Sequence, residues 1–395
     1  MDEIEIPQYF ICPISLQIMK DPVTAITGIT YDYESIKQWL SSDNNTTCPV
    51  TKQSLQLDSS LTPNHTLRRL IQSWYTSIPP PKPPLNKNQI FKLIQDLWVP
   101  HLQLKSLQKL ESLASEKETN RKFMVETGVG KAMVSLIVRC FKETQTDGIQ
   151  GALNVILCLR IPNDEAKLIL TENCDFIDSI TWVLKQEIDK AVKTKAVIVL
   201  KAFIEAASAN LLDRLKPEFF QVLIRVLRDG ISKEATKATL HVLLEACLLG
   251  RNRVKIIEAS AVSELIELEL TMPEKRTTEL ILGVLDYLCS CADGRAQFLA
   301  HSAGIAMVTK RILRVSPAAN ESSVRILASI SKFSATNEVL NEMLRVGAVS
   351  KICMVLQAEC EVNVKDTARG ILKLHSKVWN NSPCIAVYLL TRYPM

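Results

Sequence analysis

The sequence predicts a mostly α-helical protein, in which a small α+β domain is followed by an α-solenoid. Three observations support this fold class. The chain has 395 residues, which is long for one domain. It has only 12 glycines, a low number for a turn-rich all-β fold. From residue 86 onward, apolar residues recur at helical spacing, and the pattern itself repeats about every 43 residues.

The small N-terminal domain is predicted to begin with a β-hairpin and a helix. Residues 23–25 and 29–31 are strand-like and flank Ile26-Thr27-Gly28, which is a short turn signal. Asp32 is suited to N-cap a helix that runs to Leu40.

A second loop and a second helix are expected to complete this domain. Cys48-Pro49 marks the loop. Thr62-Pro63 is expected to open the helix. Four apolar residues then fall on one helical face, namely Leu67, Leu70, Ile71 and Trp74. The prediction is therefore two loops on either side of one central helix.

Residues 9–51 carry the most informative motif, which has the spacing of a RING finger without its zinc ligands. The motif consists of residues 9–16, 21–23, 28–32 and 48–51. A cross-braced zinc module needs about eight Cys or His ligands, usually in C-x₂-C pairs. Residues 1–76 contain only Cys12, Cys48 and His65. We therefore expect no metal and no cofactor here, and the two loops must be held in another way.

This motif resembles a U-box, over about residues 4–76, and the closing segment 62–74 also agrees with that family. U-boxes are ubiquitin-ligase modules that keep the RING shape with hydrogen bonds, ion pairs and a small core. The resemblance implies that five residues belong to the domain scaffold: Cys12, Pro13, Asp21, Tyr31 and Asp32.

The resemblance also implies a docking site for a ubiquitin-conjugating enzyme (E2). Family positions that match Ile14, Leu16, Trp39 and Pro49 form a shallow apolar groove for the E2 loops. Taken alone, the residues also allow Ile14, Leu16 and Trp39 to be core residues and Pro49 a simple turn former. The resemblance favours the interface, since a weak docking site needs small exposed apolar residues around an aromatic anchor.

Lys52 matches the family position that typically holds an arginine, which bridges the E2 and its ubiquitin and favours the reactive closed conjugate. Lysine keeps the charge but lacks the planar fork that can bond two carbonyls. We therefore expect activation to be present but weaker, and the alternative is a solvated surface lysine. A second departure is Tyr33, where many members have arginine. It predicts that aromatic packing replaces any ion pair made there.

Residues 77–87 are predicted to be a linker, because 78–84 is mostly proline and holds an extended conformation. A ligand for an SH3-type domain is the alternative for this stretch. The chain after it contains only helical patterns. Six boundaries, at positions 128, 174, 217, 260, 303 and 347, are 46, 43, 43, 43 and 44 residues apart. Each boundary has a small or helix-starting residue and precedes an apolar helix.

A three-helix unit with this period resembles the armadillo repeat. The resemblance implies that residues 88–395 form about six repeats, with degenerate helices at 86–118 and 364–392 as caps. Stacked repeats bury a continuous core and leave a concave groove. This groove is expected to hold a protein substrate.

Charge and cysteine content exclude several function classes. Residues 1–76 carry a net charge of −3 and the remainder +8, which is too weak to indicate nucleic-acid binding. The acidic start is not a signal peptide, and no apolar run is long enough to span a membrane. Eleven cysteines without a framework indicate reduced thiols in the cytosol or nucleus. The five histidines are far apart, so no Cys/His nucleophile is expected.

Taken together, the chain resembles the short plant U-box proteins that carry armadillo repeats. That resemblance implies an E3 ubiquitin ligase that binds a ubiquitin-loaded E2 and promotes direct transfer of ubiquitin to a substrate lysine. It further implies stress- and immunity-related signalling, homodimerisation through the U-box, and a cytoplasmic location, with the nucleus or the membrane periphery as alternatives. The competing interpretation is a non-catalytic armadillo scaffold. A karyopherin-like carrier fits poorly, because Trp98, Trp182 and Trp379 show no regular period.

Overall fold

The computed structural model describes residues 6–42, 46–55, 61–77, 85–271, 273–380, 383 and 385. The chain divides into two compact units, Met1–Pro84 and Leu85–Met395. The proline-rich stretch 78–84, on which the linker prediction depends, lies outside the described residues.

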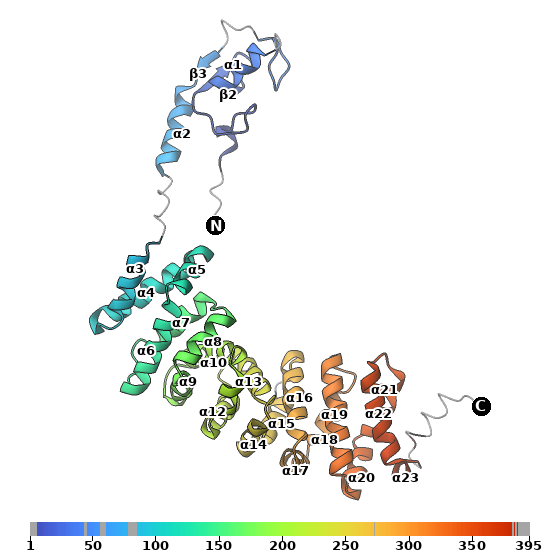
Figure 1. Ribbon diagram of the computed structural model, residues 1–395. Coiled ribbons are helices and arrows are strands. Elements are labelled where there is room, and N and C mark those ends of the chain that lie inside the picture. The colour runs from blue at the N-terminus through green and yellow to red at the C-terminus, as the bar shows by residue number, and fades with distance from the viewer. Residues whose placement is uncertain are drawn as a thin grey trace, which may run out of the picture. The chain divides into compact units, whose positions relative to one another are not determined.

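The first unit combines a three-stranded antiparallel sheet with two α-helices (Figure 1). The sheet has the order β2-β1-β3. In chain order, the elements are the 3₁₀ helix Gln8–Phe10, β1 Pro22–Ala25, β2 Thr30–Asp32, α1 Tyr33–Ser41, β3 Leu61–Pro63 and α2 His65–Ser77. A small core lies between them, with Tyr31, Ile36 and the sulfurs of Cys12 and Cys48 fully buried. The predicted α+β character of this domain is therefore confirmed.

The predicted hairpin between β1 and β2 is present. The N–H of Ala25 donates to the carbonyl of Ile29 at 2.9 Å, and the N–H of Gly28 returns to the carbonyl of Ala25 at 2.8 Å. Gly28 has φ 80°, a left-handed conformation that glycine adopts without steric cost. The turn leaves the side chain of Ile26 largely exposed.

The start of α2 differs from the prediction. Thr62-Pro63 does not open the helix, because Leu61–Pro63 pairs with β1 as an edge strand, a position that tolerates proline. The helix begins one residue after Asn64, whose Oδ1 accepts the N–H of Leu67 at 2.9 Å. On the predicted apolar face of α2, Leu70 is 51% exposed, while Ile71 is buried.

The N-cap predicted for Asp32 is also wrong in detail. Asp32 does precede α1, but its carboxylate makes no capping bond to that helix. Its Oδ1 instead accepts the N–H groups of Lys20 at 2.7 Å and Asp21 at 2.9 Å. The side chain therefore holds residues 20 and 21 and does not cap the helix that follows it.

The described part of the second unit contains helices and no strand. After two leading helices, the helices group into six consecutive triplets, and by their position we call the first, second and third helix of each triplet the short, the apolar and the long helix. The leading pair is α3 Lys87–Asp96 and α4 Pro100–Glu116. The triplets are α5 Glu118–Glu126, α6 Val129–Glu143 and α7 Ile149–Leu159; α8 Asn163–Glu172, α9 Phe176–Lys185 and α10 Lys190–Glu205; α11 Ala209–Asp213, α12 Pro217–Arg228 and α13 Lys233–Ala246; α14 Gly250–Glu258, α15 Ala261–Thr271 and α16 Lys275–Cys289; α17 Ala292–Ala300, α18 Gly304–Arg311 and α19 Pro317–Phe333; and α20 Asn337–Arg345, α21 Ala348–Gln357 and α22 Val362–Leu374. A short helix, α23 Ser376–Trp379, follows.

The predicted boundaries coincide with the starts of the apolar helices. Each of the six positions lies at most two residues before, or at, the first residue of α6, α9, α12, α15, α18 or α21. Gly128 and Gly347 have left-handed backbones, with φ 81° and 79°, which allow the sharp turn into the next helix. Pro217 occupies the first turn of α12, where its missing N–H costs nothing.

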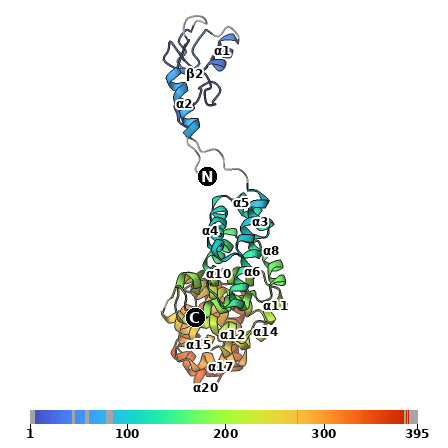
Figure 2. The same cartoon turned by 90° about the vertical axis from the view of Figure 1, so that its left-hand side faces the viewer.

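Equivalent helices of neighbouring triplets pack side by side (Figure 1), and Figure 2 shows the same array turned by 90°. The long helices α4, α7, α10, α13, α16, α19 and α22 form one row, and the apolar helices α6, α9, α12, α15, α18 and α21 form another. One continuous core runs between the rows, from Ile90 to Trp379. Each triplet thus completes the core of its neighbour, as expected of a repeat array.

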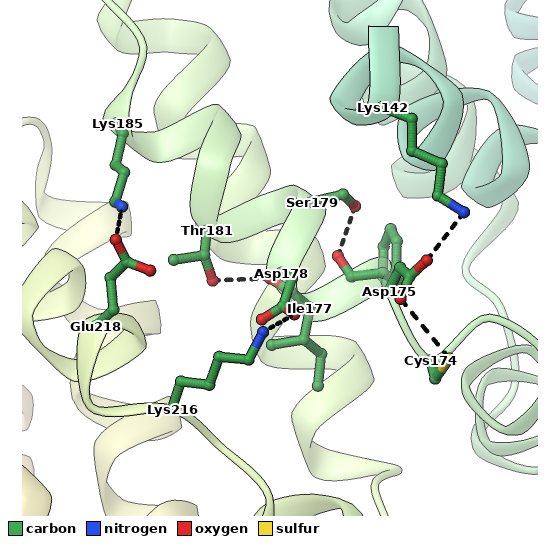
Figure 3. A network of polar contacts seen from close by, with 11 residues as sticks. Lys142, Cys174, Asp175, Ile177, Asp178, Ser179, Thr181, Lys185, Lys216 and Glu218 are labelled. Atoms are coloured by element: carbon green, nitrogen blue, oxygen red, sulfur yellow. Dashed lines mark hydrogen bonds and ion pairs between the residues drawn. The ribbon is translucent and has the colours of Figure 1, made fainter. Parts of the chain in front are cut away.

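Ion pairs also connect the row of apolar helices at the surface (Figure 3). On one side of α9, Asp175 pairs with Lys142 at 3.0 Å. On the other side, Asp178 pairs with Lys216 and Lys185 with Glu218. Exposed pairs of this kind contribute little stability individually. They favour one register between neighbouring repeats.

Candidate functional site

The first unit contains a tight loop that we call loop one, residues 12–17. Its backbone closes on itself, because the N–H of Leu16 donates to the carbonyl of Cys12 at 2.9 Å and the N–H of Cys12 donates to the carbonyl of Gln17 at 2.8 Å. An antiparallel bridge between Ile11 and Ile18 joins its two ends. Loop one is therefore fixed by its own main chain.

Loop two, residues 48–53, has the same backbone structure. The N–H of Lys52 donates to the carbonyl of Cys48 at 3.0 Å, and the N–H of Cys48 donates to the carbonyl of Gln53 at 2.7 Å. A bridge between Thr47 and Ser54 closes it. The two loops also share the sequence pattern Cys-Pro-x-x-x-Gln. This internal duplication is a signal that the sequence analysis did not use.

Leu16 and Lys52 occupy the same place in the two loops. Both have left-handed backbones, with φ 56° and 60°, a conformation that costs a residue with a side chain about 1–2 kcal/mol. The side chain of Leu16 is 77% exposed, so the alternative that Leu16 is a core residue is excluded. Lys52 is exposed as well. Each loop thus presents one side chain to solvent at a rigid position, leucine in one loop and lysine in the other.

The remaining predicted docking residues lie partly in the core. Ile14 and Trp39 are half-buried and pack against the domain core, and Pro49 is half-buried. The indole N–H of Trp39 donates to the carbonyl of Thr47 at 3.1 Å, so this ring also anchors the start of loop two. Val50, which the sequence analysis left without a role, is 51% exposed next to Pro49.

Loop two is organised around the buried sulfur of Cys48. The sulfur lies 2.9 Å from the hydroxyl oxygen of Tyr31 and 3.6 Å from that of Thr27, and it accepts the N–H of Thr51 at 3.3 Å. Burial alone would raise the pKa of Cys48, but the hydrogen bonds from Thr51, Tyr31 and Thr27 outweigh it and lower the pKa to about 6. Burial and the contact with Cys48 raise the pKa of Tyr31.

Loop one is held in the same manner by Asp32, which follows Tyr31 in β2. The N–H of Asp32 donates to the sulfur of Cys12 at 3.3 Å. Burial acts to raise the pKa of Cys12, but hydrogen bonds from Ser15 and Asp32 lower it. Pro13 is exposed at the turn of the loop. Two adjacent residues, Tyr31 and Asp32, therefore connect both loops to β2.

The expectation for Tyr33 is not met, because its side chain is 41% exposed and does not pack into the core. Its ring instead lies 5.6 Å from the ammonium nitrogen of Lys37. The ion pair of the scaffold is made elsewhere, between Asp21 and Arg68 of α2 at 2.9 Å. Sequence reasoning missed Arg68 because only the fold brings it to Asp21.

Within the described ranges, no group of three or more His, Cys, Asp or Glu side chains is arranged to hold a metal ion. Among the helices that are described, none is both long and apolar enough to cross a membrane.

The row of long helices in the second unit forms what we call the ladder face, made by α4, α7, α10, α13, α16, α19 and α22. Polar side chains connect neighbouring helices along it. Asn154 donates to Glu111 at 3.2 Å, and Arg325 pairs with Asp286 at 3.0 Å. His241 lies midway along the row, and burial together with Lys201 lowers its pKa.

Comparisons with known proteins agree with this architecture. Residues 6–78 match the U-box domain, and residues 89–395 match the plant U-box protein ARM repeat region. The second unit's fold also resembles the crystal structure of an engineered protein from the Northeast Structural Genomics Consortium. That likeness has a TM-score of 0.56 at 18% identity and covers 73% of this chain and 68% of the other.

Two relatives from Arabidopsis thaliana match over nearly their whole length. The E3 ubiquitin-protein ligase PUB24 is 42% identical, with 99% of this chain and 96% of the relative covered. The E3 ubiquitin-protein ligase PUB23 is 43% identical, with 100% and 98% covered. The chain therefore belongs to the plant U-box proteins with an armadillo repeat region, and with these relatives it is an E3 ubiquitin-protein ligase.

Proposed function

We propose that the two loops and α1 of the U-box dock the loops of a ubiquitin-loaded E2. Leu16 carries this proposal, because an apolar side chain that is 77% exposed at a conformationally strained position contributes little to the core. Ile14, Trp39 and Pro49 supply the half-buried surface around it, and we add Val50 to this docking surface. Small apolar contacts around an aromatic anchor suit a weak, transient partner.

Transfer in this scheme is direct. The amine of a substrate lysine attacks the thioester carbonyl at the C-terminus of ubiquitin, the C–N bond forms, and the E2 thiol leaves. The U-box offers no nucleophile for a covalent intermediate, since the side chains of both Cys12 and Cys48 are fully buried. The ligase contributes proximity and orientation, which can supply several kcal/mol of the barrier.

Lys52 is proposed to act on the conjugate, not on E2 docking. Its charge and exposed position suit contact with carbonyl groups of E2 and ubiquitin. Lys52→Ala should slow discharge of ubiquitin from the loaded E2 onto free lysine, with little change in affinity for the unloaded E2. Lys52→Arg should equal or exceed the native rate, because the guanidinium adds a second hydrogen bond worth about 1 kcal/mol. Equal rates for all three forms would make Lys52 a bystander.

The ladder face is proposed to recruit the protein substrate. Support comes from partly exposed polar residues on its helices, including Asn154 and His241. The test replaces both by alanine and follows two reactions. Self-ubiquitination should persist while modification of a substrate falls, whereas an unchanged substrate reaction would place recruitment elsewhere.

Three expectations from the resemblance stay predictions. They are homodimerisation through the U-box, a role in stress and immune signalling, and a cytoplasmic location with the nucleus or membrane periphery as alternatives.

The decisive experiment is self-ubiquitination with purified E1, E2, ubiquitin, ATP and the full chain. The native chain should form conjugates, and Trp39→Ala should not, because an aromatic anchor typically contributes about 2 kcal/mol or more to binding. Helical circular dichroism checks that the array remains folded. An inactive native chain with several E2 enzymes would favour the scaffold alternative.

A further inference from the structure

The hydroxyl of Tyr31 has no path to solvent and no place in the docking surface. Its side chain is fully buried, and its hydroxyl contacts the sulfur of Cys48 at 2.9 Å. Phenylalanine would fill the same space, so what the hydroxyl adds is its contacts with loop two, to the sulfur of Cys48 and to the backbone of Val50.

The bond is connected to Lys52 through Cys48, which contacts both Tyr31 and Lys52. The carbonyl of Cys48 accepts the N–H of Lys52 at 3.0 Å, and the sulfur of the same cysteine accepts the N–H of Thr51 at 3.3 Å. Lys52 is held in a left-handed conformation, φ 60°, that an unrestrained lysine rarely populates. Cys48 therefore bonds both residues that set the backbone angle at Lys52.

Strand geometry explains why this control is specific to loop two. Successive side chains of a strand point to opposite faces of the sheet. Tyr31 is paired with Val23 in the sheet and sends its hydroxyl to Cys48 in loop two. Asp32, the next residue, bonds the sulfur of Cys12 and the two N–H groups that follow loop one. Removing the hydroxyl of Tyr31 therefore releases loop two alone.

We propose that Tyr31 is a positioning residue for ubiquitin transfer, which acts through its hydrogen bond to Cys48 to hold Lys52 in the conformation that contacts the E2–ubiquitin conjugate. The proposal rests on the role of Lys52 proposed above. It assigns to the Tyr31 hydroxyl a larger effect on conjugate activation than on E2 docking, because Leu16 and Ile14 belong to loop one, and only Pro49 and Val50 of the docking surface lie in loop two.

The test uses the full chain and single-turnover discharge of ubiquitin from a loaded E2 onto free lysine, with affinity for the unloaded E2 measured in parallel. Tyr31→Phe should slow discharge about fivefold, the equivalent of one hydrogen bond, with a clearly smaller change in affinity. The matched control is Thr30→Val, which removes a hydroxyl contact of the same length, 2.9 Å to Thr24, from the neighbouring residue of the same strand. It should discharge at the native rate.

The double variant with Lys52→Ala decides whether the effect passes through Lys52. If it does, Tyr31→Phe adds no further loss in that background. A further fivefold loss there, or an equal loss in Thr30→Val, would show general loosening of the domain and overturn the proposal. Native discharge by Tyr31→Phe alongside slow Lys52→Ala would overturn it while the role of Lys52 stands. Native discharge by Lys52→Ala would overturn both.

Cys48 supplies a second, independent variant pair. Cys48→Ala removes the acceptor and should reproduce the slow discharge, while Cys48→Ser keeps an oxygen that can accept from Tyr31 and Thr51 and should recover part of the rate. If serine gives no recovery over alanine at unchanged E2 affinity, the hydrogen bond is not what positions loop two.

Discussion

The exposed leucine of loop one gives the sharpest test of the docking surface. Leu16 is 77% exposed, so nearly all of its apolar surface is available to a partner. Full burial of a leucine side chain is worth about 1.5–3 kcal/mol, and alanine retains only a small part of it. Leu16→Ala should therefore weaken E2 binding by about 1.5 kcal/mol, or roughly tenfold in Kd.

The structure offers a closely matched control for this variant. Ile26, at the tip of the β1–β2 turn, is 76% exposed and lies outside the proposed docking surface. Ile26→Ala removes a similar amount of exposed apolar surface. Both variants should unfold at the native temperature, since neither side chain packs into the core. Titration of the unloaded E2 by isothermal calorimetry measures the two affinities. Equal affinities for Leu16→Ala and Ile26→Ala would refute the reasoning, whether both are weakened or neither is.

Two further predictions follow from the way in which the loops are held. In single-turnover discharge from a preloaded E2, which needs no ATP or Mg²⁺, EDTA should leave the rate and the unfolding temperature unchanged, because hydrogen bonds to Cys12 and Cys48 hold the loops. A rate lost with EDTA and restored by zinc would contradict this. Because the hydrogen bonds of Cys48 lower its pKa from 9.0 to about 6, the stabilisation is fully present above about pH 9 and is lost as the pH falls through 6. U-box stability, followed by the fluorescence of Trp39 and Trp74, should therefore fall across that range in the native chain and much less in Cys48→Ser.

The repeat array could be predicted from the sequence because it depends on local patterns. Its apolar helices begin at small or helix-starting residues such as Gly128, Pro217 and Gly347, and each recurs at a fixed period. Such signals can be recognised in the sequence without knowledge of distant contacts. The existence of the hairpin was predictable for the same reason, since Gly28 lies in the turn itself.

The duplicated Cys-Pro-x-x-x-Gln pattern was visible in the sequence, but most other details that sequence reasoning missed depend on contacts between distant residues. Asp32 has the position of an N-cap, but two N–H groups about a dozen residues earlier compete for its carboxylate. Residues 61–63 form a strand because β1 has a free edge, although Pro63 suggests a helix start. The central role of Cys48 in loop two depends on the contacts of its sulfur with Tyr31 and Thr51. No spacing within the sequence indicates such partners.

The strand β2 explains how this domain keeps two loops in place without zinc. A structural zinc site contributes about 10–16 kcal/mol to folding, and it fixes its loops independently of the core. Here the loops are held by a handful of hydrogen bonds to Cys12, Cys48 and Asp32, each worth about 1 kcal/mol net. That sum is smaller than the contribution of a zinc site, and both sulfurs are buried in the domain core. The geometry of the docking loops is consequently tied to core packing through Tyr31 and Asp32. A substitution that loosens β2 should reduce ligase activity before it unfolds the domain.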